Sequence, residues 1–245
     1  MNKIISNNNK PVFESMAQEY IREDSHWGCD LDVIKYCIYD LLKREEDVNW
    51  LDIGCGSAFH ITSVAEFYPE ISITGLDYSS FMLRDAEARI NRMGLNNITL
   101  KKVDIIEEDI AGKYDLITFM NNGLGNLYKS RDGENPGDIR KRVVGKIDNA
   151  LNDGRYFVLS VYNRDTLGID DKYGRHLEII KELSNPEKGD FFCNYLVGGK
   201  KVPYYSHWFL EKELYELVEG TNLKLDFLES RMSRFVAQYK KVMEK

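Results

Sequence analysis

The chain has 245 residues, of which 43% are hydrophobic and 30% charged. This is the composition of a globular protein with enough apolar material for a core, and the length allows one α/β domain with an added subdomain. Acidic residues outnumber basic ones by 40 to 33, which gives a net charge of −7. Because binding to phosphates relies on clustered Lys and Arg, this charge argues against a nucleic acid or an anionic membrane as the main partner.

Cysteine and histidine lack the spacing of a disulfide framework or a metal site. We therefore expect no metal and a reducing compartment. The first ten residues are polar, and no apolar run is long enough to cross a bilayer. These features lead us to expect a cytoplasmic enzyme that does not span a membrane. The residues concerned are Cys29, Cys37, Cys55, Cys193, His26, His60, His176 and His207.

Helical spacing dominates residues 1–44, for which we expect an N-terminal helical cap. Residues 1–10 are rich in asparagine and predict no element. Residues 13–24 and 31–44 place apolar side chains at helical intervals. Asp30 stands where the second of these helices begins, and its side chain is a candidate N-cap.

Strands alternate with helices in the central part of the chain. Short apolar runs predict five strands, at 48–54, 71–77, 97–104, 113–123 and 154–163. Helices are predicted between them, at 58–68, 79–94 and 136–151. Ser79 or Ser80 is expected to cap the second of these helices, and Gly94 lies just past its end. Such alternation predicts a parallel sheet with right-handed crossovers.

The last part of the sequence breaks this alternation. A helix is predicted at 209–220, followed by strands at 223–230 and 233–241. The link between the two strands is too short for a parallel crossover, so we expect antiparallel neighbours. The predicted fold is therefore an α/β three-layer sandwich. Its sheet is seven-stranded and mostly parallel, with the last strand antiparallel.

Residues 164–208 do not follow the alternation of strands and helices. They contain aromatic-rich runs at 191–197 and 201–209, on either side of Gly198 and Gly199. This pattern predicts a hairpin, and we expect an inserted antiparallel lid over the carboxyl ends of the strands. Its aromatic side chains either line an apolar or cation-friendly pocket or form the insertion's own core. These side chains are Phe191, Phe192, Tyr195, Tyr204, Tyr205 and Trp208.

The segment LDIGCGSAFH (51–60) lies between a predicted strand and a predicted helix. Gly54 and Gly56 allow a tight turn and a close approach of the backbone to a ligand, where a Cβ would collide. The helix behind them offers N–H groups that have no partner within the helix. Asp52, at the end of the strand, could accept a hydrogen bond from a cationic or amine-bearing group of a ligand.

Two more carboxylates end the neighbouring predicted strands. Asp77 ends the second strand, where an acidic residue commonly accepts hydrogen bonds from both hydroxyls of an adenosine ribose. Asp104 ends the third strand, where a carboxylate can accept a hydrogen bond from an adenine amino group. Three such carboxylates beside a glycine turn fit one nucleoside laid across the ligand-binding edge of an open α/β sheet.

The ordered motifs resemble those of the class I, Rossmann-like S-adenosylmethionine (SAM)-dependent methyltransferases. The first motif of that family is an acidic residue followed by glycines at alternate positions, here Asp52, Gly54 and Gly56. Ala58 stands where a third glycine is often found. The terminal antiparallel pair of strands is also typical of the family. The resemblance therefore implies SAM as the cofactor.

The resemblance covers residues 45–163 and 209–241. It implies that 45–163 and 209–245 form the SAM-binding domain and leaves 164–208 as the inserted substrate lid. Within the domain, several residues would lie near the methionine part, the ribose and the nucleoside of SAM. These residues are Gly54, Cys55 and Gly56 for the methionine part, Asp77 for the ribose, and Tyr78 and Met82 for the nucleoside.

The remaining expected contacts come from three parts of the chain. By the resemblance, Asp104 and the backbone of Ile105 hold adenine, and Asn121 faces the sulfonium. Asn126, in the same Asn- and Gly-rich stretch (119–127), either contacts a ligand or belongs to an ordinary loop. Tyr20 ends the first predicted helix, where such enzymes often place a lid over SAM.

No catalytic residue is identified by its pattern alone. His207 ends the inserted hairpin and is a candidate general base, although a lone histidine is more often structural. Tyr162 ends the fifth predicted strand and is a candidate substrate contact. An amine acceptor that arrives neutral needs no base, so the lack of a clear base is compatible with methyl transfer.

The sequence therefore predicts a SAM-dependent methyltransferase that acts on a small-molecule acceptor, with an amine nitrogen as one candidate atom. One alternative is a non-catalytic SAM- or SAH-binding regulatory protein, which would use the same residues. Another is an NAD(P)-dependent oxidoreductase, but Phe59 stands where the dinucleotide fingerprint requires its third small residue. The oligomeric state is not predicted.

Overall fold

The structure of the chain is a computed structural model that describes most of the sequence. The described residues are 9, 30–44, 47–129, 134–167, 177–179, 184–197, 200–231 and 233–243. The helix predicted at 13–24, with Tyr20, and the glycine pair predicted to turn the hairpin both lie outside these residues.

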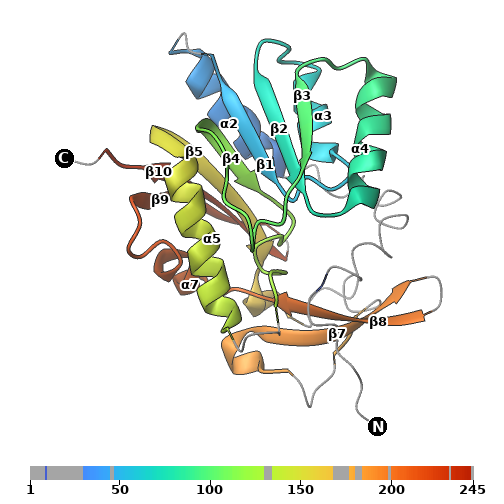
Figure 1. Cartoon of the computed structure of the whole chain (residues 1–245). Helices are drawn as coiled ribbons and strands as arrows, with labels where there is room; N and C mark the ends of the chain where they lie inside the picture. Colours follow the sequence, from blue (N-terminus) through green and yellow to red (C-terminus); the bar gives the residue numbers. More distant parts are fainter. Residues whose placement is uncertain are drawn as a thin grey trace.

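Seven strands form the main sheet, and helices flank it (Figure 1). The strands are β1 (Asn49–Ile53), β2 (Ser72–Asp77), β3 (Ile98–Lys102), β4 (Tyr114–Phe119), β5 (Leu151–Tyr162), β9 (Leu223–Arg231) and β10 (Arg234–Lys241). The helices are α2 (Leu31–Leu42), α3 (Phe59–Ala65), α4 (Ser80–Met93), α5 (Pro136–Ala150) and α7 (Glu211–Glu216). Short 3-10 helices, η3 (Arg164–Thr166) and η5 (Pro186–Lys188), lie in the connections.

The strand order in the main sheet is β3-β2-β1-β4-β5-β10-β9. The pairs from β3 to β5 are parallel, whereas β10 is antiparallel to both β5 and β9. The predicted fold, with its last strand antiparallel, is confirmed. The structure adds that this last strand lies inside the sheet rather than at its edge, because Phe235 of β10 pairs with Val161 on one side and Ser230 on the other.

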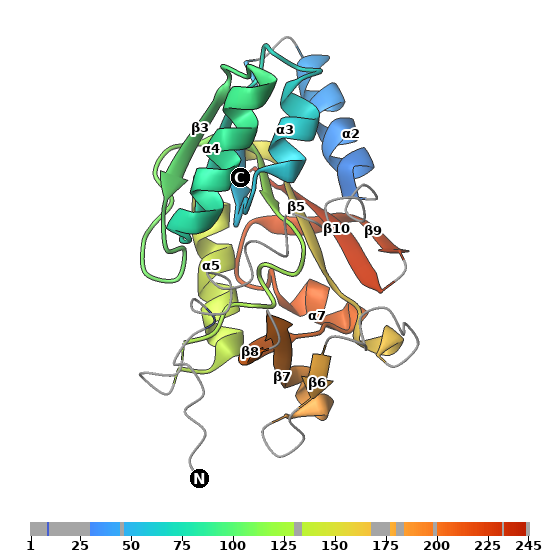
Figure 2. The ribbon, with the colours of Figure 1, turned by 90° about the vertical axis from the view of Figure 1, so that its right-hand side faces the viewer.

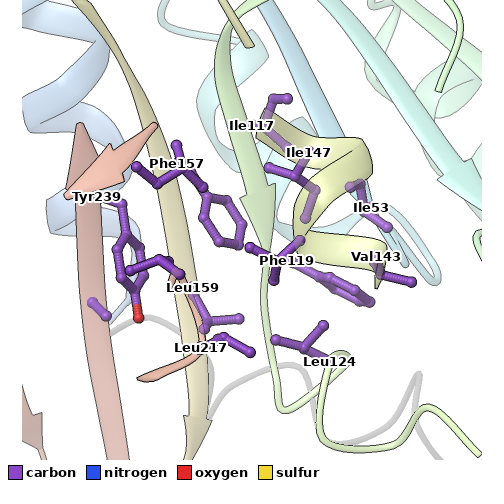
Figure 3. Packing of buried hydrophobic residues seen from close by; sticks show 14 of the residues in the cluster. Ile53, Ile117, Phe119, Leu124, Val143, Ile147, Phe157, Leu159, Leu217 and Tyr239 are labelled. Atoms are coloured by element: carbon purple, nitrogen blue, oxygen red, sulfur yellow. The ribbon is translucent and has the colours of Figure 1, made fainter. Parts of the chain in front are cut away.

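Helices cover both faces of the main sheet, which makes three layers (Figures 1 and 2). Buried side chains of α2, α3 and α4 share one apolar cluster with one face, and those of α5 and α7 share a second cluster with the other. All six residues of β4 are buried, as expected of a parallel strand covered on both faces. Figure 3 shows Ile147 of α5 packed near Ile53, Ile117 and Phe119 of the sheet.

Local sequence signals set the ends of α4 as predicted. The Ser79 hydroxyl accepts a hydrogen bond from the Met82 N–H, which satisfies one of the donors at the start of the helix. At the other end, Gly94 adopts the left-handed conformation with φ of 68°, which a residue without a Cβ adopts without strain.

Asp30 occupies the N-cap position of α2, as predicted, but its side chain does not cap the helix. The backbone of Asp30 is helical, with φ of −87° and ψ of −16°, and its side chain makes no capping hydrogen bond. Instead its carboxylate lies 3.4 Å from the guanidinium of Arg234, on β10. Both side chains are almost fully buried, so a distant ion pair has taken the place of the local cap.

A second, smaller sheet contains β6 (Leu177–Ile179), β7 (Asp190–Val197) and β8 (Lys200–His207), all antiparallel. Figure 1 shows it beyond the carboxyl ends of β4 and β5. Most of the aromatic side chains singled out in the sequence are buried within it. Phe191, Tyr204 and Trp208 form an apolar cluster with Tyr162 and Cys193. The structure therefore favours the insertion's own core over an aromatic pocket.

Candidate functional site

A cavity of about 170 Å³ lies at the carboxyl ends of β1, β2 and β4 and beside the loop that follows β3. Parallel strands present their carboxyl ends at one edge, so residues far apart in sequence meet there. Nine of the eleven expected cofactor contacts line it: Gly54, Cys55, Gly56, Asp77, Tyr78, Met82, Asp104, Ile105 and Asn121. Of the other two, Asp52 is not among the lining residues, and Tyr20 is outside the described ones.

The glycine turn between β1 and α3 forms one wall of the cavity. Gly54 and Gly56 have φ of 67° and 54°, conformations that favour glycine. A Cβ on Gly56 would meet no protein atom within 4 Å and would therefore occupy open space beside the cavity. Ala58, where the related family often has glycine, also has a positive φ, of 65°. The turn is thus an open cradle of backbone that a ligand can approach closely.

Asp77 holds this turn against the end of β2. One carboxylate oxygen accepts a hydrogen bond from the Gly56 N–H at 2.9 Å, and the other accepts one from the Ser79 N–H at 2.8 Å. A carboxylate can accept about four hydrogen bonds. Holding the loop is therefore compatible with accepting hydrogen bonds from a ligand's hydroxyl groups.

Asp52 lies behind the turn, in the core of the sheet. It is 1% exposed, and it accepts a hydrogen bond of 2.5 Å from the Thr118 hydroxyl, which itself accepts one from the Trp50 indole at 2.8 Å. Burial raises the pKa of Asp52 from 3.8 to about 7; the Thr118 hydrogen bond lowers it and the negative charge of Asp77 raises it further. The Asp52 side chain is therefore not positioned to contact a ligand in the cavity directly.

Residues after β2 and β3 form the opposite side of the cavity. The Asp104 carboxylate accepts a hydrogen bond from the Ile106 N–H at 3.3 Å, which places it at the start of the loop that follows β3. The side chains of Ile105 and Met82 are buried, and both border the cavity with Tyr78. An apolar wall with carboxylates at its rim suits a flat base attached to a sugar.

Two consecutive asparagines follow β4, and the first of them lines the cavity. Asn121 and Asn122 have φ of 54° and 58°, a left-handed conformation that asparagine adopts more readily than most residues. Their N–H groups donate to the hydroxyl and the carbonyl of Ser160 on β5, both at 2.8 Å. Two such residues in a row turn the chain sharply and leave the Asn121 side chain at the cavity.

A buried network of amides joins this turn to the second sheet. The Asn122 amide donates to Asn126 Oδ1 and to the Ser206 hydroxyl, both at 3.0 Å. Asn126 Oδ1 also accepts from the Tyr204 hydroxyl, at 2.5 Å. From the N-terminal part, Asn9 donates to the carbonyl oxygen of Asn126 at 2.7 Å, and both Asn9 and Asn126 line the cavity. The sequence offered Asn126 as a candidate but gave no sign of Asn9.

His60 also lines the cavity, although the sequence did not predict it there. It is 5% exposed, and among the described residues its Nε2 atom has no hydrogen-bond partner. Burial lowers its pKa from 6.5 to about 4; the Asp30 carboxylate opposes this shift and Arg234 adds to it. The ring is therefore neutral at pH 7. Its place in the first turn of the helix after the glycine turn was the available signal.

Neither His207, the candidate general base, nor Tyr162, the candidate substrate contact, lines the cavity. His207 is 3% exposed and lies between two carboxylates, with Nδ1 2.8 Å from Asp190 and Nε2 3.4 Å from Glu213. Burial alone would raise the pKa of Asp190, but hydrogen bonds from His207 and Tyr205 hold it below its usual value. Tyr162 packs against Trp208, with ring centroids 4.9 Å apart. Both residues therefore lie among buried contacts between β5 and the second sheet rather than at the cavity.

Within the described ranges, no group of three or more His, Cys, Asp or Glu side chains is arranged to hold a metal ion. None of the helices in that part of the chain is both long and apolar enough to span a membrane.

Comparison with known proteins identifies the fold and the family of this chain. Across 96% of this chain and the whole of the other, the structure matches an S-adenosylmethionine-dependent methyltransferase from Clostridium acetobutylicum, with a TM-score of 0.68 and 17% identity. The fold is thus that of the SAM-dependent methyltransferases. A family model described as a methyltransferase domain matches residues 44–219, and the chain belongs to that family, whose cofactor is SAM.

Curated relatives match shorter parts of the chain. Human EEF1A lysine methyltransferase 2 is 26% identical over 143 residues, which are 58% of this chain and 58% of that protein. Demethylmenaquinone methyltransferase of Listeria welshimeri is 32% identical over 91 residues, or 36% of this chain and 39% of that protein. The chain therefore spans less than two thirds of either enzyme, and the two act on very different acceptors by their names.

Proposed function

We propose that the chain transfers a methyl group from SAM to a small-molecule acceptor, with an amine nitrogen as one candidate atom. The observation that carries the proposal is the open glycine cradle beside Asp77, because a Cβ at Gly56 would intrude where a ligand must approach. When bound there, SAM supplies an electrophilic methyl group on its sulfonium. The protein supplies position and a dry environment.

The residues present fit SAM in the order of the strands. Asp104 and the Ile105 backbone, after β3, would hold adenine, and Asp77, after β2, would accept hydrogen bonds from the ribose hydroxyls. The glycine turn with Cys55, after β1, would run along the methionine part. Tyr78 and Met82 would cover the nucleoside, and Asn121, after β4, would lie at the methionine end. Tyr20 keeps its proposed place in a lid over SAM.

A small acceptor is supported by the contact between the cavity wall and the second sheet. Asn126 and Tyr128 line the cavity, and Tyr128 stacks on Tyr205 of β8 at 4.7 Å between ring centroids. We therefore propose residues 164–208 as a substrate lid, residues 1–44 as an N-terminal cap, and the remainder as the SAM-binding domain. The net charge of −7 also disfavours a nucleic acid.

No general base is required by this proposal. The pKa of His60 is lowered to about 4, so this histidine is a weak base at neutral pH, and His207 is engaged by two carboxylates. An amine that arrives uncharged can attack without prior proton removal. Alignment of the nucleophile with the methyl group and the sulfur is then the main contribution of the protein.

Calorimetric titration with SAH and SAM tests cofactor binding, and Asp77→Asn tests the site. We expect the variant to bind about 100-fold more weakly, because two hydrogen bonds to a charged group are weakened. Asp153→Asn, whose side chain is 54% exposed on β5, is the control and should bind as the native protein does. Release of SAH in a screen of amines and other small molecules tests the acceptor. Failure of the folded native protein to bind either compound would refute the proposal.

A further inference from the structure

Two buried side chains, Asp30 and Arg234, connect to Asn121 at the cavity. Asp30 precedes α2, Arg234 begins β10, and Asn121 follows β4. One guanidinium nitrogen of Arg234 lies 3.4 Å from the Asp30 carboxylate and donates to Asn121 Oδ1 at 3.1 Å. The Arg234 side chain is 4% exposed and that of Asp30 is 0% exposed, whereas Asn121 borders the cavity.

The chemistry of arginine fixes the orientation of the Asn121 amide. A guanidinium group has five N–H donors and no acceptor, so only the oxygen of the amide can face it. The NH₂ group must then point away from Arg234, and among the described residues it has no hydrogen-bond partner. Asp30 neutralises the arginine, which allows this buried donor to remain in place.

The position of Asn121 in the sheet indicates which part of a ligand it meets. The edge carries Asp104, Asp77, the glycine turn and Asn121 in the strand order β3-β2-β1-β4. If the nucleoside lies over β3 and β2, as in the proposed function on which this inference rests, β4 receives the amino acid end of SAM. The anionic group at that end is a carboxylate, which an N–H donor binds well.

We propose that Arg234 is a positioning residue that turns the NH₂ group of Asn121 toward the cavity, where it donates a hydrogen bond to the carboxylate of the amino acid portion of SAM. Arg234 acts through Asn121 and does not itself border the cavity. The left-handed backbone of Asn121 adds to the fixed geometry, since φ of 54° sets the direction in which its side chain leaves the chain.

The test uses Asn121→Asp and two ligands that differ in the amino acid portion. Aspartate tolerates the same backbone conformation and pairs with Arg234, so we expect the thermal midpoint to be retained or raised. It presents an acceptor to the cavity in place of a donor. SAH should therefore bind about tenfold more weakly or worse. Binding of 5′-methylthioadenosine, which lacks the amino acid portion, should change less than about twofold.

Two further variants separate positioning from a purely structural role. Arg234→Lys keeps a side chain that only donates, so the amide keeps its orientation and SAH binding should be close to native. The double variant Asp30→Asn/Arg234→Gln replaces the ion pair by neutral amides, and the introduced glutamine side chain can accept a hydrogen bond from the NH₂ group of Asn121. This variant should lose affinity for SAH but not for 5′-methylthioadenosine. It therefore tests the proposal independently if Asn121→Asp fails to fold.

Native-like SAH affinity in Asn121→Asp would overturn the proposal. It would mean that Asn121 only accepts the hydrogen bond from Arg234, a role that aspartate fills equally well without affecting ligand binding. Equal loss of both ligands would overturn it as well, since that result indicates general damage to the site. If the native protein binds neither ligand, the proposed function itself fails, and this outcome is distinct from both.

Discussion

The buried carboxyl of Asp52 allows us to predict how the free energy of unfolding depends on pH. Replacing it by asparagine keeps the shape and an oxygen for the Thr118 hydroxyl but removes the ionisable group. In the native protein, burial raises the pKa of Asp52 from 3.8 to about 7. The folded state therefore binds more protons than the unfolded state between these values. The stability from this group is present at low pH and is lost as the pH rises through about 7.

The size of the effect follows from the linkage relation. Between pH 5 and pH 8, the shift of Asp52 lowers the free energy of unfolding by about 2.5 kcal/mol. His60 acts in the opposite direction, because its pKa is lowered from 6.5 to about 4. The stability that His60 contributes to the folded protein is therefore present at high pH and is lost as the pH falls. That contribution raises the free energy of unfolding by about 2 kcal/mol over the same range. The two slopes nearly cancel in the native protein.

Urea denaturation at several pH values and constant ionic strength measures this prediction. The stability of Asp52→Asn minus that of the native protein should rise by about 2.5 kcal/mol from pH 5 to pH 8, or roughly 5 °C in Tm. His60→Gln should show the opposite trend, with a difference that falls by about 2 kcal/mol. A difference for Asp52→Asn that stays constant with pH would refute the reasoning, since it would mean that Asp52 is ionised in the folded protein throughout.

Three further substitutions test the turn, the amide network and a helix cap. Gly56→Ala and its control Gly154→Ala both place a Cβ in open space at a positive φ, so each should lower the free energy of unfolding by about 1–2 kcal/mol. Only Gly56→Ala should weaken SAH binding in calorimetry, and equal affinities would contradict the cradle. Asn122→Ala removes three buried hydrogen bonds and should cost about 3 kcal/mol or more in urea denaturation; a loss below about 1 kcal/mol would argue against the network. Ser79→Ala should cost about 1 kcal/mol through the lost cap, and an unchanged Tm would show that the hydrogen bond adds nothing.

Features that depend on neighbours in the sequence were predicted well. The alternation of strands and helices, the Ser79 cap and the Gly94 end of α4 all follow from residues within one helix or one strand. Nine of the eleven predicted cofactor contacts also line the cavity, because the carboxyl ends of parallel strands must meet at one edge. Knowing where each strand ends was therefore enough to bring most of these residues together.

Features that depend on partners far along the chain were not predictable in the same way. Asp30 has the residue type and the position of a cap, but its partner Arg234 is 204 residues away. Asp52 is covered by Thr118 of a neighbouring strand, 66 residues away, and is therefore buried rather than at the cavity. The sequence did not distinguish whether the aromatic side chains of the insertion face a ligand or pack against one another, because a ligand pocket and an apolar core contain the same types of side chain.

The placement of β10 has a consequence for how the protein folds during its synthesis. The strand lies between β5 and β9 but is synthesised after both of them. Until it is translated, the buried half of β5 has no neighbour on that side, and Asp30 lacks the arginine that neutralises it. We expect a nascent chain that ends before β10 to keep an open sheet edge and an unoriented Asn121 amide. Completion of the sheet and orientation of the Asn121 amide would then be a single event late in synthesis.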